Sequence, residues 1–134
     1  MAQNPNPLAQ PRPTDAELAI LRVLWDRGPS TVREVHAALS VRQASGYTTV
    51  LKLLQIMTDK GLVVRDESQR AHVYTSRLGE LRTQRQILGD LVDRAFNGSP
   101  AKLVLQALAG RRATEEELRD IRALLDQLEE GGAT

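Results

Sequence analysis

Hydrophobic residues recur at every third or fourth position in the first part of the chain, which predicts a series of amphipathic helices. The first helix should begin at the capping box Thr14–Glu17, in which each side chain bonds the other residue's backbone N–H. It should end at Gly28-Pro29, because glycine adopts the left-handed cap conformation and proline cannot continue a helix. The apolar face of this helix is expected to comprise Leu18, Leu21, Leu24 and Trp25.

Two more helices follow by the same criteria. A second capping box, Thr31–Glu34, opens a short helix. A third helix is expected from about Gly46 to Lys60, with Gly61 as its cap. Its buried stripe is expected to comprise Val50, Leu53, Leu54 and Met57.

The hydrophobic period then changes from helical spacing to strict alternation. Residues 62–65 and 71–75 alternate around a polar turn at residues 66–70, which predicts a two-stranded β-hairpin. Three helices and a hairpin are the element order of a winged helix-turn-helix domain, so we expect that domain at residues 14–77. Residues 1–13 hold four of the six prolines and are expected to form a flexible N-terminal arm.

The chain is predicted to be helical again from residue 78 onward. Helix starts are expected at Ser99-Pro100 and at the capping box Thr114–Glu117. Short helices with long apolar stripes bury little surface alone, so we expect residues 78–134 to be a helical dimerisation domain that packs against a second copy. The fold class is therefore mainly α with a small β-hairpin. The expected interface residues are Leu81, Leu88, Leu91, Val92, Leu103, Val104, Leu108, Leu118, Ile121, Leu125 and Leu128.

The amino-acid composition excludes several classes of protein. The 134 residues include no cysteine, which excludes a disulfide framework, a thiolate metal site and a cysteine nucleophile. His36 and His72 lack neighbours at metal-ligand spacing, and neither glycine-rich phosphate-binding motif is present. We therefore expect no metal, no cofactor and no enzymatic activity. No apolar run approaches the ~20 residues that cross a bilayer, so we expect a cytoplasmic protein without membrane insertion.

Charge and side-chain type favour double-stranded DNA as the partner. Residues 1–78 carry a net charge of +3 and residues 79–134 carry −2, which suits an N-terminal half that faces an anion. At about 100° per residue, Lys52 and Gln55 lie within about 40° of Thr48, opposite the apolar stripe. Such side chains hydrogen-bond base edges or phosphates. The expected DNA-contacting residues are Thr31, Arg33, Tyr47, Thr48, Thr49, Lys52, Gln55, Arg70 and His72.

The same pattern leaves other functions open. A polar helix face is compatible with simple solvation. Leu51 and Ile56 flank the polar stripe, so a second hypothesis is a protein-interaction module that docks a partner there. A third is a ligand-sensing regulator of another winged-helix family, with a pocket between the winged helix and the dimer helices.

Several segments together resemble the bacterial penicillinase-repressor family of the BlaI/MecI type, over roughly residues 14–130. These segments are Thr14–Leu18, Thr31–Val35, Tyr47–Val50, Lys60–Val63 and Arg70–Tyr74. The resemblance implies a homodimeric transcriptional repressor, of the kind that regulates antibiotic resistance, whose winged helix binds a palindromic operator. It also implies that the C-terminal helices hold the dimer.

The chain departs from the family's pattern at three places. Some members are inactivated through a signalling protease that leads to cleavage at an Asn-Phe bond, where this chain has Gln106-Ala107. A copper-responsive branch uses C-terminal cysteines, which are absent here. Many members carry a basic residue near position 56, where this chain has Ile56, so the contacts with bases are expected to differ.

Overall fold

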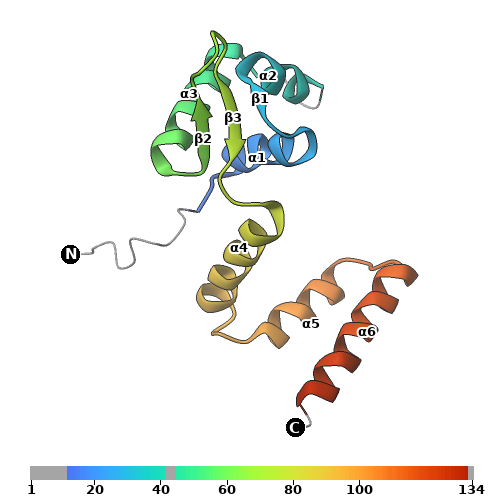
Figure 1. Ribbon diagram of the computed structural model, residues 1–134. Coiled ribbons are helices and arrows are strands. Elements are labelled where there is room, and N and C mark those ends of the chain that lie inside the picture. The colour runs from blue at the N-terminus through green and yellow to red at the C-terminus, as the bar shows by residue number, and fades with distance from the viewer. Residues whose placement is uncertain (1–11, 42–44, 133–134) are drawn as a thin grey trace, which may run out of the picture. The chain divides into compact units, whose positions relative to one another are not determined.

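The computed structural model describes residues 12–41 and 45–132. Its elements, shown in Figure 1, are α1 (Asp15–Arg27), β1 (Ser30–Thr31), α2 (Val32–Ser40), α3 (Tyr47–Lys60), β2 (Val63–Asp66), β3 (Val73–Ser76), α4 (Glu80–Ala95), α5 (Pro100–Gly110) and α6 (Glu115–Gly132). The expected N-terminal arm lies outside the described residues, except for residues 12 and 13.

The helix ends follow the local rules that the sequence predicts. The Glu17 backbone N–H donates to Thr14 Oγ1 at 3.2 Å, and the Thr14 N–H donates to Glu17 Oε1 at 2.9 Å. Gly28 and Gly61, which follow α1 and α3, have φ angles of 88° and 84°, in a region that L side chains rarely adopt. The predicted starts and ends of α1 and α3 are therefore confirmed.

The sheet is larger than the predicted hairpin. Within the described residues it has three antiparallel strands in the order β1-β3-β2, with Tyr74 paired to Ser30 on one side and Arg65 on the other. The hairpin strands also run one or two residues later than predicted. The predicted hairpin is confirmed as β2 and β3, whereas β1 was not predicted because it is only two residues long and is defined by its distant partner β3, not by local alternation.

The core of the first part of the chain lies between α1, α2, α3 and the sheet. α3 contributes Val50, Leu54 and Met57, all fully buried, while Leu53 is half-buried. Three helices closed by a small antiparallel sheet form a winged helix-turn-helix domain. The other buried apolar residues are Ile20, Leu21, Val23, Leu24, Val32, Val35, Leu39, Leu62, Val63 and Tyr74.

The helices that follow the wing, α4 to α6, bury far fewer side chains than α1 to α3. Contacts divide the chain into two units between Gly89 and Asp90, within α4. The expected caps are present, since Ser99 Oγ accepts from the Lys102 N–H at 3.2 Å and Thr114 forms its capping box with Glu117. Thr83 is the one buried residue on α4, and no residue of α5 or α6, all of them described, is buried. The predicted boundary between residues 77 and 78 stays a prediction.

Candidate nucleic-acid interface

The polar face of α3 is held outward by the burial of its opposite face. Val50, Leu54 and Met57 anchor the helix in the core. The side chains on the other side are exposed, and a helix of this kind can present them to a groove of DNA. These exposed residues are Tyr47, Thr48, Thr49, Lys52 and Gln55.

A ring contact positions the first residue of α3. The imidazole of His36 lies 5.8 Å from the ring of Tyr47, centroid to centroid, at an interplanar angle of 74°. His36 Nε2 is also 2.7 Å from the carbonyl oxygen of Ser45, just before α3. His36 thus contacts both the first residue of α3 and the segment just before it. Its support of Tyr47 was not predicted, because it depends on a contact between two helices.

The start of α2 places Thr31 and Arg33 beside the wing. Thr31 Oγ1 accepts from the Glu34 N–H at 3.2 Å, and the Thr31 N–H donates to Glu34 Oε1 at 2.9 Å. The backbone hydrogen bond from Thr31 holds the pKa of the exposed Glu34 carboxyl below its usual value. Thr31 also pairs with Val73 in the sheet. The Thr31 hydroxyl is thus occupied by capping, whereas the Arg33 side chain is exposed.

The wing is the hairpin of β2 and β3 with the turn between them. The Ser68 backbone N–H donates to Asp66 Oδ1 at 2.9 Å and holds the pKa of that carboxyl below its usual value. Arg65 Nε donates to Glu67 Oε2 at 2.8 Å. Arg70 and His72, further along the turn, are both exposed.

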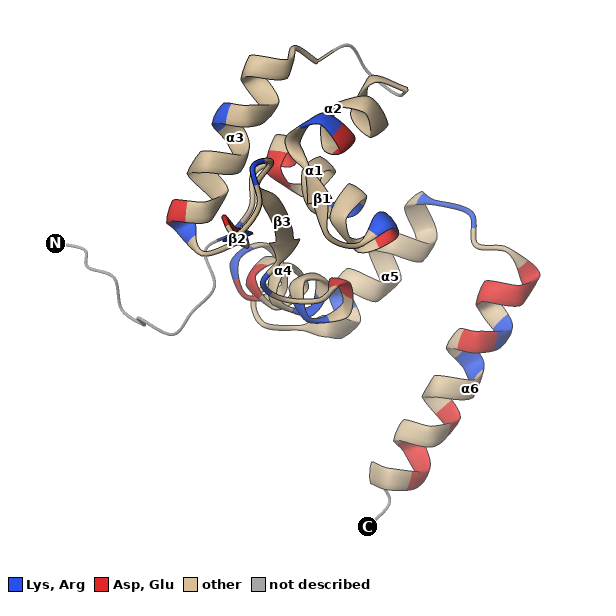
Figure 2. Ribbon diagram, turned by 45° about the horizontal axis from the view of Figure 1, so that its top comes forward, with Lys and Arg blue, Asp and Glu red and all other residues tan. Residues whose placement is uncertain are grey.

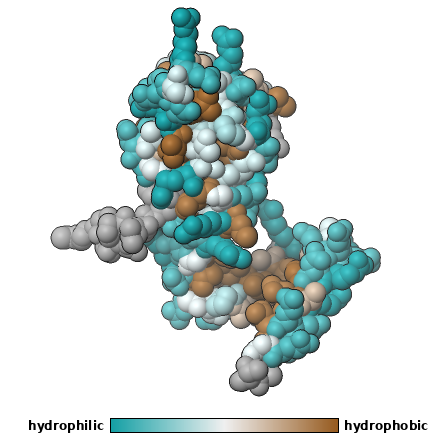
Figure 3. All heavy atoms as spheres, viewed as in Figure 1, coloured by the Kyte–Doolittle hydropathy of each residue, from teal (hydrophilic) through white to brown (hydrophobic). Residues whose placement is uncertain are grey.

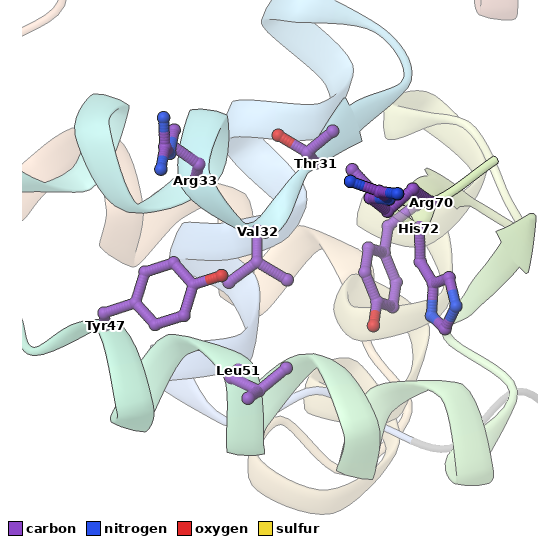
Figure 4. Close-up of a pocket in the computed structure, with 9 residues that line it drawn as sticks. Thr31, Val32, Arg33, Tyr47, Leu51, Arg70 and His72 are labelled. Carbon is purple, nitrogen blue, oxygen red and sulfur yellow. The ribbon is translucent and has the colours of Figure 1, made fainter. Parts of the chain in front are cut away.

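A hollow of about 440 Å³ lies between α2, α3 and the wing, lined by five of the nine residues expected to contact DNA. Figure 4 shows Tyr47 and Arg33 on one side of Val32, and Arg70 and His72 on the other, with Leu51 on α3. Arg33 and Arg70 bring two positive charges from separate elements to this surface. The lining residues are Thr31, Val32, Arg33, Tyr47, Leu51, Arg70, Ala71, His72 and Tyr74.

The other four expected residues do not line the hollow. Thr48, Thr49, Lys52 and Gln55 lie elsewhere along the exposed surface of α3. Ile56, also exposed, is an apolar neighbour of this surface. The surface as a whole can form hydrogen bonds and ion pairs with a polar or anionic partner, since cationic, hydroxyl and amide groups surround its small apolar areas.

Within residues 12–41 and 45–132, no three His, Cys, Asp or Glu residues come together as a metal site would require. No helix among these residues has the length and apolarity needed to cross a membrane.

A family model described as penicillinase repressor matches residues 13–127. The chain belongs to the penicillinase repressor family. A relative from Mycobacterium tuberculosis (strain CDC 1551 / Oshkosh), named transcriptional regulator BlaI, is 34% identical over 118 residues, which are 87% of this chain and 85% of the relative. The penicillinase repressor of Bacillus licheniformis is 25% identical over 117 residues, 87% of this chain and 91% of that protein.

Two solved structures are similar to part of the chain, each at 28% identity over 54% of this chain and 88% of the other. One is the solution structure of the DNA-binding domain of the repressor BlaI, with a TM-score of 0.49. The other is monomeric Bacillus licheniformis BlaI in complex with the blaP half-operator, with a TM-score of 0.48.

Apolar side chains reach the surface of the helices that follow the wing in this penicillinase repressor family member (Figure 3). Of the residues expected at a dimer interface, Val92, Leu103, Leu118 and Ile121 are half-buried. Leu105 and Leu124, which the prediction omitted, are exposed as well, and Leu105 reaches 68%. The remaining expected residues, all exposed, are Leu81, Leu88, Leu91, Val104, Leu108, Leu125 and Leu128.

Proposed function

We propose that this penicillinase repressor family member is a homodimeric transcriptional repressor that binds a palindromic DNA operator through α3 and the wing. The observation that carries the proposal is the exposed polar face of α3 beside a hollow with basic side chains on two of its sides. Lys52 and Gln55 come from α3, whereas Arg33 comes from α2 and Arg70 from the wing. The names of the two relatives, a transcriptional regulator and a penicillinase repressor, support the same function.

The two groups of residues have different tasks in this proposal. Thr48, Lys52 and Gln55 contact base edges, because hydroxyl, ammonium and amide groups match the donors and acceptors in the major groove. Arg33 and Arg70 neutralise phosphates on either side of the hollow, which fixes the position of α3 without selecting a sequence. Figure 2 shows basic residues on α2, α3 and the wing.

The dimer follows from the helical region. α5 and α6 bury no residue within the described chain, although both carry leucine stripes. Large exposed apolar surfaces mark sites of association, and most soluble oligomers are symmetric dimers. α6 also carries acidic residues along its length and basic residues in its first half (Figure 2), which suits the solvated rim of such an interface. A twofold dimer matches a palindrome, since each winged helix takes one half-site.

The test is selection of duplexes from a random DNA pool by the full-length protein, followed by fluorescence anisotropy at two salt concentrations. The proposal expects an enriched palindrome with half-sites about one or two helical turns apart. Affinity should fall steeply with salt, because each neutralised phosphate releases a counterion. Failure to enrich any sequence, together with weak and salt-insensitive binding, would overturn the proposal.

One observation favours a second function, the docking of a protein. Ile56 is 38% exposed and Val64 is 55% exposed, so apolar side chains interrupt the polar surface of α3 and β2. A protein-docking surface requires that Ile56→Asp abolish partner binding while Lys52→Ala leaves it intact. The proposed repressor requires the DNA affinity to depend on Lys52.

A further inference from the structure

The segment that joins the wing to α4 is tied to the winged helix by hydrogen bonds. The Arg77 backbone N–H donates to the Leu62 carbonyl at 3.0 Å, and Arg77 Nε donates to the Gly61 carbonyl at 2.7 Å. These two carbonyls lie where α3 ends. One residue later, the carbonyl of Leu78 accepts from Trp25 Nε1 of α1 at 3.1 Å. The segment is therefore fixed to α1 and to the end of α3.

The first turn of α4 is attached to the same side of α1. Arg22 forms an ion pair and hydrogen bond with Glu80 Oε2, and its guanidinium lies 5.4 Å from the centre of the Trp25 ring. Glu80 also accepts from Gln84 Nε2 at 3.2 Å. Thr83, in the next turn, is 2% exposed. The single pair of exposed charges is weak alone, but here it is combined with a cation–π contact, an indole hydrogen bond and a buried side chain.

The contacts of Arg22 and Trp25 also determine the direction in which α4 leaves the winged helix. α4 begins on the winged helix and continues past Gly89, where the second unit begins. The hydrogen-bonded backbone makes a helix of this length stiff. Whatever fixes Glu80 and Leu78 on α1 therefore fixes the first turns of α4, up to Gly89, with respect to α3.

We propose that Arg22 and Trp25 are positioning residues that hold α4 at one angle to α3 and thereby set the distance between the two α3 helices of a dimer. The proposal rests on the proposed function, a dimer that binds two half-sites. When one half-site is bound, the second binds at an effective concentration that depends on how well the spacing matches. When α4 is fixed, the second winged helix is held at one distance from the first, so its effective concentration at a half-site with the matching spacing is high. When α4 is loosely attached, the distance varies and the effective concentration at any one spacing is lower.

The experiment compares the wild type with the double variant Arg22→Gln/Trp25→Phe, which removes the ion pair and the indole donor but keeps an aromatic ring. Arg82→Gln is the matched control, because it removes one positive charge from the exposed surface of α4. The probes are the palindrome that the wild type selects from a random pool, the same palindrome with one or two base pairs added at its centre, and a duplex with a single half-site. Full-length protein is used throughout, with circular dichroism and sedimentation as checks of fold and dimer.

The expected result is a loss of the spacing preference while binding to a single half-site is kept. The double variant should bind the half-site within about twofold of the wild type, and the selected palindrome about tenfold or more weakly, because avidity is lost when geometry no longer matches. Its affinities for the three palindromes should become nearly equal, and Arg82→Gln should keep the wild-type preference. Glu80→Gln, which leaves Trp25 in place, should give an intermediate preference.

Two results would overturn the proposal. One is a folded double variant that retains the spacing preference of the wild type. The other is an equal loss on the half-site and on the palindrome, which would show that Arg22 and Trp25 act on the winged helix itself; if the double variant does not fold, Glu80→Gln decides by the same criteria. A wild type that selects no palindrome would instead contradict the proposed function, before Arg22 and Trp25 are considered.

Discussion

Glu17 is a carboxylate that is 2% exposed in the first turn of α1. Burial acts to raise its pKa, but Lys60 Nζ, at 2.7 Å and 3.0 Å from its two oxygens, and the Thr14 backbone N–H act to lower it. The hydrogen bonds prevail, so the pKa of Glu17 lies below its usual value. Glu17 thereby joins the beginning of α1 to the last residue of α3.

Glu17→Gln should lower the free energy of unfolding at neutral pH by about 1.5–3 kcal/mol, the range for a hydrogen bond to a charged group. Because folding lowers the pKa of Glu17, this stabilisation is complete above the pKa of the unfolded state and is lost as pH falls through the folded value. Urea unfolding at neutral and acidic pH should therefore show the difference between wild type and variant shrinking in acid. Glu67→Gln, at an exposed pair with Arg65, is the control and should change stability by less than about 1 kcal/mol. A difference that is the same at both pH values would contradict the account.

Lys52→Ala should weaken binding to the selected palindrome by about 1–3 kcal/mol, because Lys52 lies at the centre of the exposed face of α3. Lys102→Ala is the control, since it removes the same charge from α5 and should leave the affinity unchanged. Anisotropy titrations with the palindrome and with a scrambled duplex separate the two kinds of contact. A loss confined to the palindrome identifies a base contact, and a uniform loss with a smaller salt slope identifies a phosphate contact. An affinity equal to that of the wild type would remove Lys52 from the interface.

The residues also show where sequence-based prediction stops. The capping role of Glu17 was predictable, since its partner Thr14 stands three positions away. Its pairing with Lys60 was not, because 43 residues separate the two and only the packing of α1 on α3 brings them together. The ties from Trp25 to Leu78 and from Arg22 to Glu80 were missed for the same reason.

At the scale of elements, two glycines of the helices should respond oppositely to the same substitution. Gly61 caps α3 at φ 84° and ψ 17°, a left-handed conformation that costs an L residue about 1–2 kcal/mol. Gly89 lies inside α4, and a Cβ there meets nothing within 4 Å. Gly61→Ala should therefore lower the melting temperature, whereas Gly89→Ala should raise it, since alanine is favoured over glycine in helix interiors by about 1 kcal/mol. Each variant is the other's control in differential scanning calorimetry, and equal signs would contradict the helix bounds.

The elements were predicted well where their signals are local. The capping boxes at Thr14, Thr31 and Thr114 and the glycine at position 61 depend on neighbours within one helical turn, so they were found. β1 was missed because its two residues become a strand only by pairing with β3. The candidate interface was predicted residue by residue, but the hollow that joins Arg33 to Arg70 depends on tertiary packing and was not expected.

At the scale of the whole molecule, the proposed dimer should be sensitive to charge on its apolar surface. Leu128→Asp places a carboxylate at an exposed leucine of α6, where burial in an interface would be costly. Gln127→Asp adds the same charge at the neighbouring position and is the control. Sedimentation equilibrium should show Leu128→Asp shifted towards monomer at concentrations where Gln127→Asp remains a dimer. Two dimers of equal stability would place Leu128 outside the interface.

In the proposed dimer, the absence of buried side chains from α5 and α6 of the single chain would also make the lifetime of the protein depend on its abundance. Helices that acquire an interior only on association obey mass action, so their melting temperature rises with total protein concentration. When synthesis slows, dissociated chains with solvent-facing leucines become a larger share of the population, and unfolded chains are those that proteases degrade. Degradation of dissociated chains would lower the protein concentration further and so favour more dissociation. A gradual fall in synthesis would then cause an abrupt loss of the dimer.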